Sequence, residues 1–278
     1  MTEHLTVDEG TIAYEVEGSG PLIVLAHGMG DSRAAYRPLV PYLLEAGYRV
    51  ASVDLRGSGE SSTEWSDWSR TAIAGDLLAV IRHLGGPAVL VGHSISGGAA
   101  TIAAAREPDL ITAVVEVAPF TREQSFGPAQ LRDRRVRRGM LRLLGAVALG
   151  SVPLWRSYLD VAYPGPKPGH WAQRIDRVDA LLREPARMKA LKGMGMTTPT
   201  DAGARLGDVR RPVLVLMGTL DPDWVDPQAE GQAVVDALPT GLGRLEMIEG
   251  AGHYPHDQYP ERVAPLMLSF LESVAPRG

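Results

Sequence analysis

Short runs of purely apolar residues recur along the chain, and longer segments with helically spaced apolar positions separate them. The runs at 21–28 ("PLIVLAHG") and 88–92 ("AVLVG") do not alternate with polar residues, which is typical of strands buried on both faces of a sheet. Parallel strands need a long crossover, and a helix usually supplies it. The pattern therefore predicts an α/β fold with a mostly parallel central sheet flanked by helices.

The same pattern places the expected elements. An antiparallel hairpin is expected in residues 5–21, with turns at Glu9-Gly10 and Gly18–Gly20. Further strands are predicted at 21–28, 48–54, 88–91, 111–120, 211–218 and 243–250, and helices at about 34–46, 70–84, 97–108, 227–238 and 260–274. Strand and helix thus alternate, except in one long segment.

Residues 121–210 interrupt this alternation. They contain helical patterns but no convincing strand, and "YPGPKPGH" within them is typical of a stiff loop. The alternation resumes at residue 211. We therefore expect a core domain formed by residues 1–120 and 211–278, with residues 121–210 inserted as a helical cap between two strands of one sheet.

Composition narrows the class of protein. With 45% hydrophobic residues the chain of 278 can bury a large core, and its net charge of −5 argues against a general nucleic-acid binder. No cysteine is present, which excludes disulfides and thiolate chemistry. The polar, alternating start does not match a secretory signal, and the longest apolar stretch, 143–155, is too short to span a bilayer. We expect a soluble, cytoplasmic protein.

The segment 88–100, "AVLVGHSISGGAA", carries the strongest candidate for chemistry. A nucleophilic serine on a tight strand-to-helix turn usually has glycine two positions before and after it, as G-x-S-x-G. Ser94 has Gly92 before it but Ser96 after it. Ser96 has Gly98 after it but a serine before it. Because the predicted strand ends at Val91, Ser94 falls in the turn, and we expect it to be the nucleophile. The alternative is two serines that only cap a turn and a helix.

Candidate partners for the serine follow it in the chain. A serine hydroxyl is a poor nucleophile unless a histidine takes its proton and an acid orients that histidine. "TLDPDWVDP" offers Asp221, Asp223 and Asp226, the last of which is placed to cap the next helix. "AGHYPHDQYP" offers His253 and His256. Both segments follow predicted strands, and open α/β sheets gather their ligands at carboxyl strand ends.

Five segments in this order resemble the α/β-hydrolase family: "HGMG", "DLRGSGES", "GHSISGG", "MGTLDPDWVDP" and "GAGHYPHDQYPE". The resemblance extends over nearly the whole chain. It implies the acid at Asp221, by the pattern G-x-x-D, with Asp223 as the alternative, and it implies the base at His253. It also implies that the backbone N–H groups of Met29 and Ile95 form the oxyanion hole.

Four further polar residues lie near these motifs. His27 and His93 flank the site in the family, and we expect structural roles for both. His256 and Asp257 form an H-x-x-H-D cluster with no further ligand nearby in the sequence. We expect them on a loop surface and expect no metal site.

The resemblance implies a serine hydrolase that cleaves an acyl bond of a small carboxylic ester or lactone through an acyl-enzyme, without a cofactor. The same triad supports C–C bond hydrolysis, thioester hydrolysis and peracid formation, which stay open. Epoxide and haloalkane hydrolysis are disfavoured, because those relatives attack with aspartate where this chain has Ser94. A ligand-sensing receptor that keeps the triad is the alternative from another class. The expected partner is a small acyl substrate.

The expected cap contains a segment, 132–155, with a basic front and an apolar rear. We expect a cap helix whose apolar face covers the pocket, and association with a membrane surface is the weaker alternative. A mostly apolar acyl pocket could be lined by Met140, Trp155, Tyr158, Met194 and Met196, although packing within the cap would explain each equally well.

The segment "LIVLAHGMGDSR" also permits a rival interpretation. A strand followed by G-x-G, with Asp54 ending the next strand, mimics a dinucleotide-binding fingerprint. However, Arg33 stands where the fingerprint requires its third glycine. We therefore expect neither nicotinamide nor flavin binding, and mainly structural roles for Asp54 and Arg56.

Overall fold

The computed structural model describes residues 1–123 and 127–274. Its strands are β1 Glu3–Val7, β2 Gly10–Glu17, β3 Leu22–Ala26, β4 Arg49–Val53, β5 Ala88–His93, β6 Ile111–Val117, β7 Val213–Gly218 and β8 Gly243–Ile248. Its α-helices are α1 Val40–Glu45, α2 Arg70–His83, α3 Ile95–Arg106, α4 Pro128–Arg132, α5 Arg134–Leu149, α6 Val152–Ala162, α7 Trp171–Leu182, α8 Pro185–Gly195, α9 Thr200–Gly203, α10 Pro227–Ala237, α11 Pro255–Gln258 and α12 Pro260–Val274. Two 3-10 helices are η1 Arg33–Tyr36 and η2 Leu206–Asp208.

The strands of the described chain form one sheet in the order β1-β2-β4-β3-β5-β6-β7-β8. β2 pairs antiparallel with both β1 and β4, and the remaining neighbours pair parallel. The predicted mostly parallel sheet, led by a hairpin, is confirmed. Because the parallel strands share a direction, their carboxyl ends meet at one edge of the sheet, where ligands bind in open α/β folds.

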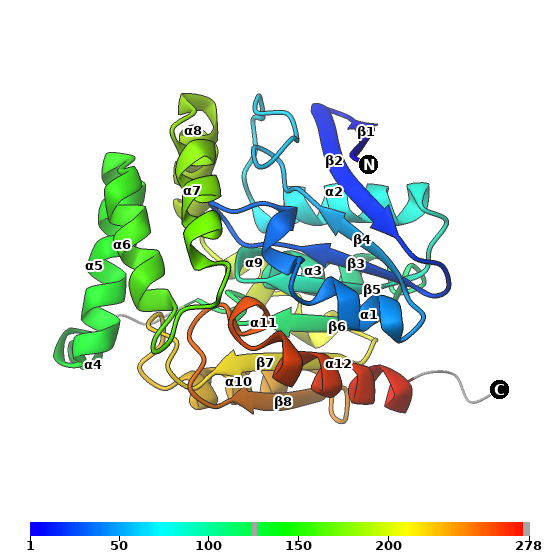
Figure 1. Cartoon of the computed structure of the whole chain (residues 1–278). Coiled ribbons are helices and arrows are strands. Elements are labelled where there is room, and N and C mark those ends of the chain that lie inside the picture. The colour runs from blue at the N-terminus through cyan, green and yellow to red at the C-terminus, as the bar shows by residue number, and fades with distance from the viewer. Residues whose placement is uncertain (124–126, 275–278) are drawn as a thin grey trace.

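Helices cover both faces of the sheet (Figure 1). Side chains of α2, α3 and α10 pack on one face, for example Leu77, Ile102 and Val234. Side chains of α1 and α12 pack on the other, for example Leu43 and Phe270. Burial of these two apolar layers is the main favourable contribution to folding. It makes the sheet a rigid platform for the loops at its edge.

Several predicted boundaries differ from the structure, among them those of one helix and one strand. The helix expected at about 34–46 is two short helices, η1 and α1, because Pro38 lies between them and a proline cannot continue a helix. The strand expected to end at Val91 continues to His93, the last residue of β5. Ser94 nevertheless remains the residue at which the strand changes into the helix α3.

Between β6 and β7 the described residues form α4 to α9 and η2, without a strand. In Figure 1, α5 to α8 stand at the end of the molecule toward which the arrows of β6 and β7 point. The amphipathic segment 132–155 is not one helix. Gly150 has a φ of 62°, a left-handed conformation that favours glycine and ends α5 before α6 begins.

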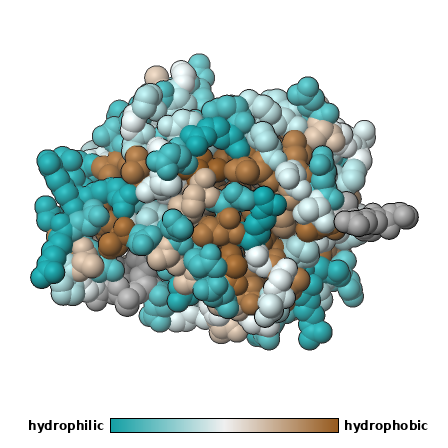
Figure 2. All heavy atoms as spheres, turned by 90° about the horizontal axis from the view of Figure 1, so that it is seen from below, coloured by the Kyte–Doolittle hydropathy of each residue, from teal (hydrophilic) through white to brown (hydrophobic). Residues whose placement is uncertain are grey.

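The outer surface of α5 mixes arginines with leucines. Leu141, Leu144 and Leu149 are 61%, 54% and 74% exposed. Figure 2 shows mainly hydrophilic residues over the left end of the molecule, where α4 and α5 lie, with hydrophobic ones between them. No helix within the described ranges is both long and apolar enough to cross a membrane. Association with a membrane surface stays the weaker, untested alternative.

A buried arginine ties α7 to the loops at the edge of the sheet. Arg174 is 0% exposed, and its Nη2 donates to Asp31, after β3, at 2.5 Å. Its Nε lies 3.5 Å from an oxygen of Asp257 in α11. Burial by itself would raise the pKa of Asp257, but Arg174 and two hydrogen bonds lower it to about 2. Two carboxylates buried against one guanidinium thus join the inserted helices to the core.

We expect Arg174→Met to lower the free energy of unfolding by about 3–5 kcal/mol, because it leaves Asp31 and Asp257 buried without their cation. Arg156→Met is the matched control. Arg156 is half exposed and pairs with Asp179 at 3.3 Å, so its loss should cost less than about 1 kcal/mol. Urea denaturation measures both, and equal small losses would show that Arg174 does not hold the two parts together.

Candidate active site

Ser94 occupies a strained turn between β5 and α3. Its φ is 56° and its ψ is −118°, a conformation that residues other than glycine rarely adopt. Two hydrogen bonds to the segment after β6 hold it there. Its N–H donates to Val117 O at 3.0 Å, and its carbonyl accepts from Phe120 N at 3.1 Å. The strain therefore presents the serine side chain at the edge of the sheet, as a nucleophile elbow does.

Close backbone contacts explain why small residues surround Ser94. A Cβ on Gly92 would lie 2.1 Å from the carbonyl oxygen of Ser96, and a Cβ on Gly28 would lie 3.1 Å from the Cβ of Ser94. The hydroxyl of Ser96 is buried and donates to His27 O at 2.6 Å. Ser96 thus ties the start of α3 to the end of β3, and its hydroxyl is committed to the backbone.

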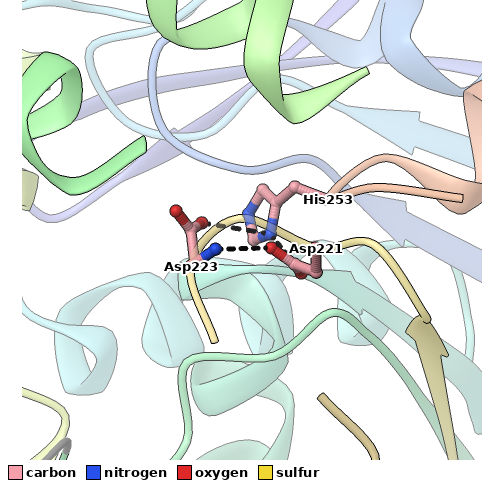
Figure 3. A group of neighbouring side chains, drawn as sticks. All are labelled: Asp221, Asp223 and His253. Atoms are coloured by element: carbon pink, nitrogen blue, oxygen red, sulfur yellow. Dashed lines mark hydrogen bonds and ion pairs between the residues drawn. The ribbon is translucent and has the colours of Figure 1, made fainter. Parts of the chain in front are cut away.

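His253 lies together with two aspartates, Asp221 and Asp223 (Figure 3). Ser94, Asp223 and His253 line one small cavity. His253 Nδ1 is 2.9 Å from Asp221 Oδ2 and 3.3 Å from Asp223 Oδ2. The other oxygen of Asp221 accepts the backbone N–H of Asp223 at 3.0 Å. Asp221 is 0% exposed, whereas Asp223 lines the cavity described below and accepts from Tyr158 Oη at 2.6 Å. The imidazole therefore faces two carboxylates in different surroundings.

These carboxylates change the acidity of the imidazole. Burial alone would lower the pKa of His253, but the negative charges of Asp221 and Asp223 outweigh it and raise that pKa to about 9. Burial, opposed by His253 and aided by Asp221, raises the pKa of Asp223. The imidazole of His253 is thus a stronger base than that of an ordinary histidine. Once protonated, it releases its proton less readily.

The backbone of His253 is held from both sides. Its N–H donates to Ala162 O, at the end of α6, at 2.9 Å. Its carbonyl lies 2.9 Å from Nε2 of the buried His93, and burial holds the pKa of His93 well below its usual value. A neutral His93 therefore donates from Nε2. His27 accepts Leu55 N at Nε2 and so donates from Nδ1 to Gly28 O at 2.6 Å.

Asp221, Asp223 and His253 are also of metal-ligating types, and one atom of each lies within 4.8 Å of the others. However, the histidine atom nearest both carboxylates is Nδ1, which carries the proton of the hydrogen bond to Asp221. A metal ligand needs an unprotonated nitrogen, so this hydrogen bond would be lost. The arrangement suits an oriented imidazole better than a metal ligand set.

A cavity of about 350 Å³ opens beside Ser94. Its lining is mostly apolar and combines core residues with residues of the inserted helices; it consists of Met29, Arg70, Ser94, Ile95, Phe120, Arg122, Glu123, Gln130, Val136, Met140, Leu143, Leu144, Val147, Met194, Gly195, Thr197, Thr198, Pro199 and Asp223. A second, much smaller cavity shares Ser94 with the first and is also lined by His253, Gly28, Trp155, Tyr158 and Tyr254. Ser94 and His253 therefore face a shared space.

The structure brings most of the expected pocket residues to this space. Met140 and Met194 line the main cavity, and Trp155 and Tyr158 line the smaller one. Met196 does not: it is 76% exposed and borders a separate surface hollow. The expectation for Met196 is corrected, because α8 ends at Gly195 and the next side chain turns outward.

Met29 and Ile95 also line the cavity beside Ser94. Ile95 is the first residue of α3, where backbone N–H groups have no partner within the helix. Met29 follows the close turn at Gly28. A Cβ on Gly30, whose φ is 69°, would strike Trp155 of α6, so the turn also touches the inserted helices.

Comparison with known proteins identifies the family of the chain. The model of the alpha/beta hydrolase family matches residues 23–266. The chain belongs to this family. A 2-(acetamidomethylene)succinate hydrolase from Mesorhizobium japonicum is 26% identical over 96% of this chain and 94% of its own. Among solved structures, a bromoperoxidase from Bacillus anthracis is 22% identical, covers 98% of this chain and 100% of its own, and has a TM-score of 0.82.

A thermophilic esterase from Thermogutta terrifontis, solved with malate bound, is 25% identical with a TM-score of 0.72 and covers 99% of both chains. The bromoperoxidase likeness shows the fold alone. Together with the family match, the Mesorhizobium hydrolase and the Thermogutta esterase support a hydrolytic enzyme. The names of these relatives do not determine which bond this alpha/beta hydrolase cleaves.

One expectation near the site was wrong. His256 and Asp257 lie in α11 and are 0% and 1% exposed, not on a loop surface. His256 packs on the rings of Tyr36 and His93, at 4.6 and 4.7 Å between centroids. Polar residues after a motif histidine usually indicate a surface loop. Asp257 contacts Tyr163 and Arg174 of the inserted segment, whereas His256 packs on rings of the core. No local sequence pattern shows these contacts.

We expect His253 to titrate with a midpoint near 9 in ¹⁵N-histidine-labelled alpha/beta hydrolase followed by NMR. Asp223→Asn removes a negative charge that stabilises the imidazolium, so the midpoint should fall by about one pH unit or more. Asp226→Asn is the matched control, because Asp226 caps α10 through Ala229 N. An unchanged midpoint in Asp223→Asn would show that Asp223 does not act on His253.

Proposed function

We propose that this alpha/beta hydrolase cleaves the acyl bond of a small carboxylic ester or lactone through an acyl-enzyme intermediate. One observation carries the proposal: Ser94, in its strained turn, and His253, hydrogen-bonded to Asp221, line the same narrow space. A serine, a histidine and an acid in this relation are the parts that acyl transfer needs.

In the proposed reaction, Ser94 Oγ attacks the substrate carbonyl carbon while His253 Nε2 takes the hydroxyl proton. The N–H groups of Met29 and Ile95 donate to the oxyanion of the tetrahedral intermediate. Its collapse breaks the bond to the leaving alcohol, which receives the proton from His253, and leaves Ser94 acylated. His253 then deprotonates a water that attacks the acyl group, which releases the acid and restores the serine.

The two aspartates take different parts in this proposal. Asp221 is fully buried and nearer to Nδ1, so it holds the imidazole in the tautomer whose Nε2 faces the substrate. Asp223 adds a second negative charge at 3.3 Å and stabilises the imidazolium that forms when the serine loses its proton. Its hydrogen bond with Tyr158 makes α6 a part of this arrangement.

The inserted helices form the cap of the proposed enzyme. We divide the chain into a core of residues 1–120 and 211–278 and a cap of residues 121–210. Met140 and Met194, both from cap helices, line the cavity into which an acyl chain would extend. Their flexible thioethers adapt to irregular ligands.

The relatives bear on the substrate. The Mesorhizobium relative is a hydrolase of a succinate derivative, and the Thermogutta esterase was solved with malate. Both names denote molecules with two carboxylates. An esterase is therefore represented among the proteins similar to this chain, which supports the proposed reaction class.

We expect a fluorophosphonate probe to label the wild-type protein and Ser96→Ala but not Ser94→Ala. Ser96 is the matched control, since it lies two residues away and its hydroxyl is bound to His27 O. Labelling is measured by intact-protein mass spectrometry. Equal labelling of wild type and Ser94→Ala would sink the assignment of the nucleophile.

We expect Asp221→Asn to reduce kcat on short 4-nitrophenyl esters by about 10³–10⁴-fold, because the histidine loses the acid that selects its tautomer. Asp223→Asn should retain far more activity, and its rate should reach a plateau at lower pH than that of wild type, since deprotonated His253 is the active form. Steady-state rates between pH 5 and 10 test this. If Asp223→Asn is the more damaging change, the roles of the two aspartates are reversed.

A further inference from the structure

Arg70 places a buried positive charge on the wall of the substrate cavity. It is the first residue of α2, is 4% exposed and lines the same cavity as Ser94. Its Nε donates to Phe120 O at 2.9 Å, and its Nη1 donates to Thr197 Oγ1 at 3.1 Å. Both acceptors are neutral. Phe120 in turn donates to the carbonyl of Ser94, so Arg70 lies two hydrogen bonds from the backbone of the nucleophile.

The charge of Arg70 has no counter-ion in the part of the chain that the structure describes. No ion pair joins it to any of those residues, although buried arginines are almost always paired. Asp201 acts on it only through space and is itself hydrogen-bonded to Thr71. Burial consequently lowers the pKa of Arg70 to about 10, which Asp201 opposes only in part.

The other charged groups at this cavity are engaged elsewhere or lie apart from Arg70. Arg122 pairs with Glu230 at 3.2 Å, and Asp223 is bound by Tyr158 and His253. Glu123 also lines the cavity but forms no ion pair with Arg70. Arg70 is therefore the lining cation that lacks a carboxylate among the described residues.

The position of Arg70 is built into the core. A Cβ on Gly98, in the first turn of α3, would lie 2.7 Å from Arg70 Cδ and 3.0 Å from its Nε. The side chain thus lies directly on the helix that begins at the nucleophile. Hydrogen bonds to described residues account for two of the five N–H donors of the guanidinium. The planar fork matches a carboxylate, which it binds through paired hydrogen bonds.

We propose that Arg70 is the anion-binding subsite of this cavity and that it selects substrates that carry a carboxylate apart from the scissile acyl bond. This rests on the proposed function and names its substrate class: half-esters of dicarboxylic acids, or esters of hydroxy acids. A substrate carboxylate supplies the missing counter-ion and anchors the molecule while its ester carbonyl lies at Ser94.

Two pairs of substrates test the proposal, each with an anionic member and its carboxamide isostere. Mono-4-nitrophenyl glutarate and 4-nitrophenyl glutaramate differ on the acyl side, and 4-acetoxybenzoate and 4-acetoxybenzamide differ on the alcohol side. In wild type we expect kcat/KM to favour the anion in at least one pair by about 10- to 100-fold, the range of a charge-assisted hydrogen bond. Arg70→Gln should remove this preference, and Arg70→Lys should retain part of it.

Arg122→Gln is the matched control, because Arg122 borders the same cavity but already has Glu230 as its partner. Its preference for the anion should equal that of wild type. If Arg70 only ties α2 to Phe120 and Thr197, both members of each pair will lose rate equally in Arg70→Gln, and the proposal is overturned. Absence of any anion preference in wild type overturns it too, even if Arg70→Gln does not fold.

Calorimetry with glutarate separates this proposal from the proposed function. Ser94→Ala cannot form the acyl-enzyme but keeps the cavity, so it should bind glutarate. The double variant Ser94→Ala/Arg70→Lys should bind it several-fold more weakly, and Ser94→Ala/Arg70→Gln at least tenfold more weakly. If the wild-type protein hydrolyses none of the esters, the proposed function is wrong. The glutarate affinities of the three variants still test whether Arg70 binds a carboxylate. Equal binding by all three proteins, or none by Ser94→Ala, overturns the subsite.

Discussion

The strained backbone at Ser94 is the constraint on which the rest of the site depends. A left-handed φ at a residue other than glycine costs on the order of 1–3 kcal/mol and persists only where the surroundings hold it. Here the N–H of Ser94 donates to the carbonyl of Val117 and its carbonyl accepts from Phe120, and the absence of side chains on Gly92 and Gly28 allows the close approach. Two neighbouring parallel strands, β3 and β6, must therefore end beside β5 before the serine can be presented.

The inserted helices then complete what the sheet begins. In α6, the carbonyl of Ala162 accepts the N–H of His253, and the hydroxyl of Tyr158 donates to Asp223. Through Arg174, α7 is joined to the loop after β3 at Asp31 and to α11 at Asp257. The imidazole is thus positioned by core and inserted helices together. A displacement of these helices would change both the shape of the cavity and the electrostatic surroundings of His253, because the same helices contact both.

Much of the fold and of the candidate site could be predicted from the sequence. Apolar runs separated by helical patterns indicated the parallel sheet, and the order of serine, acid and histidine segments indicated which loops would meet at its edge. Ser94 was separated from Ser96 by the predicted end of a strand. The strand ends two residues later than predicted, at His93. Ser94 still lies in the turn, because small residues mark the turn and their positions do not depend on the exact strand boundary.

The sequence by itself determines local backbone preference and which face of an element is buried, because periodicity and motif spacing depend only on nearby residues. Contacts between distant segments depend on packing, and only the tertiary structure decided them. It placed Asp221 nearer than Asp223 to His253, buried His256 and Asp257, and turned Met196 outward. It also left Arg70 at the cavity with neutral partners. Whether a charge is paired depends on distances between elements, which no local pattern contains.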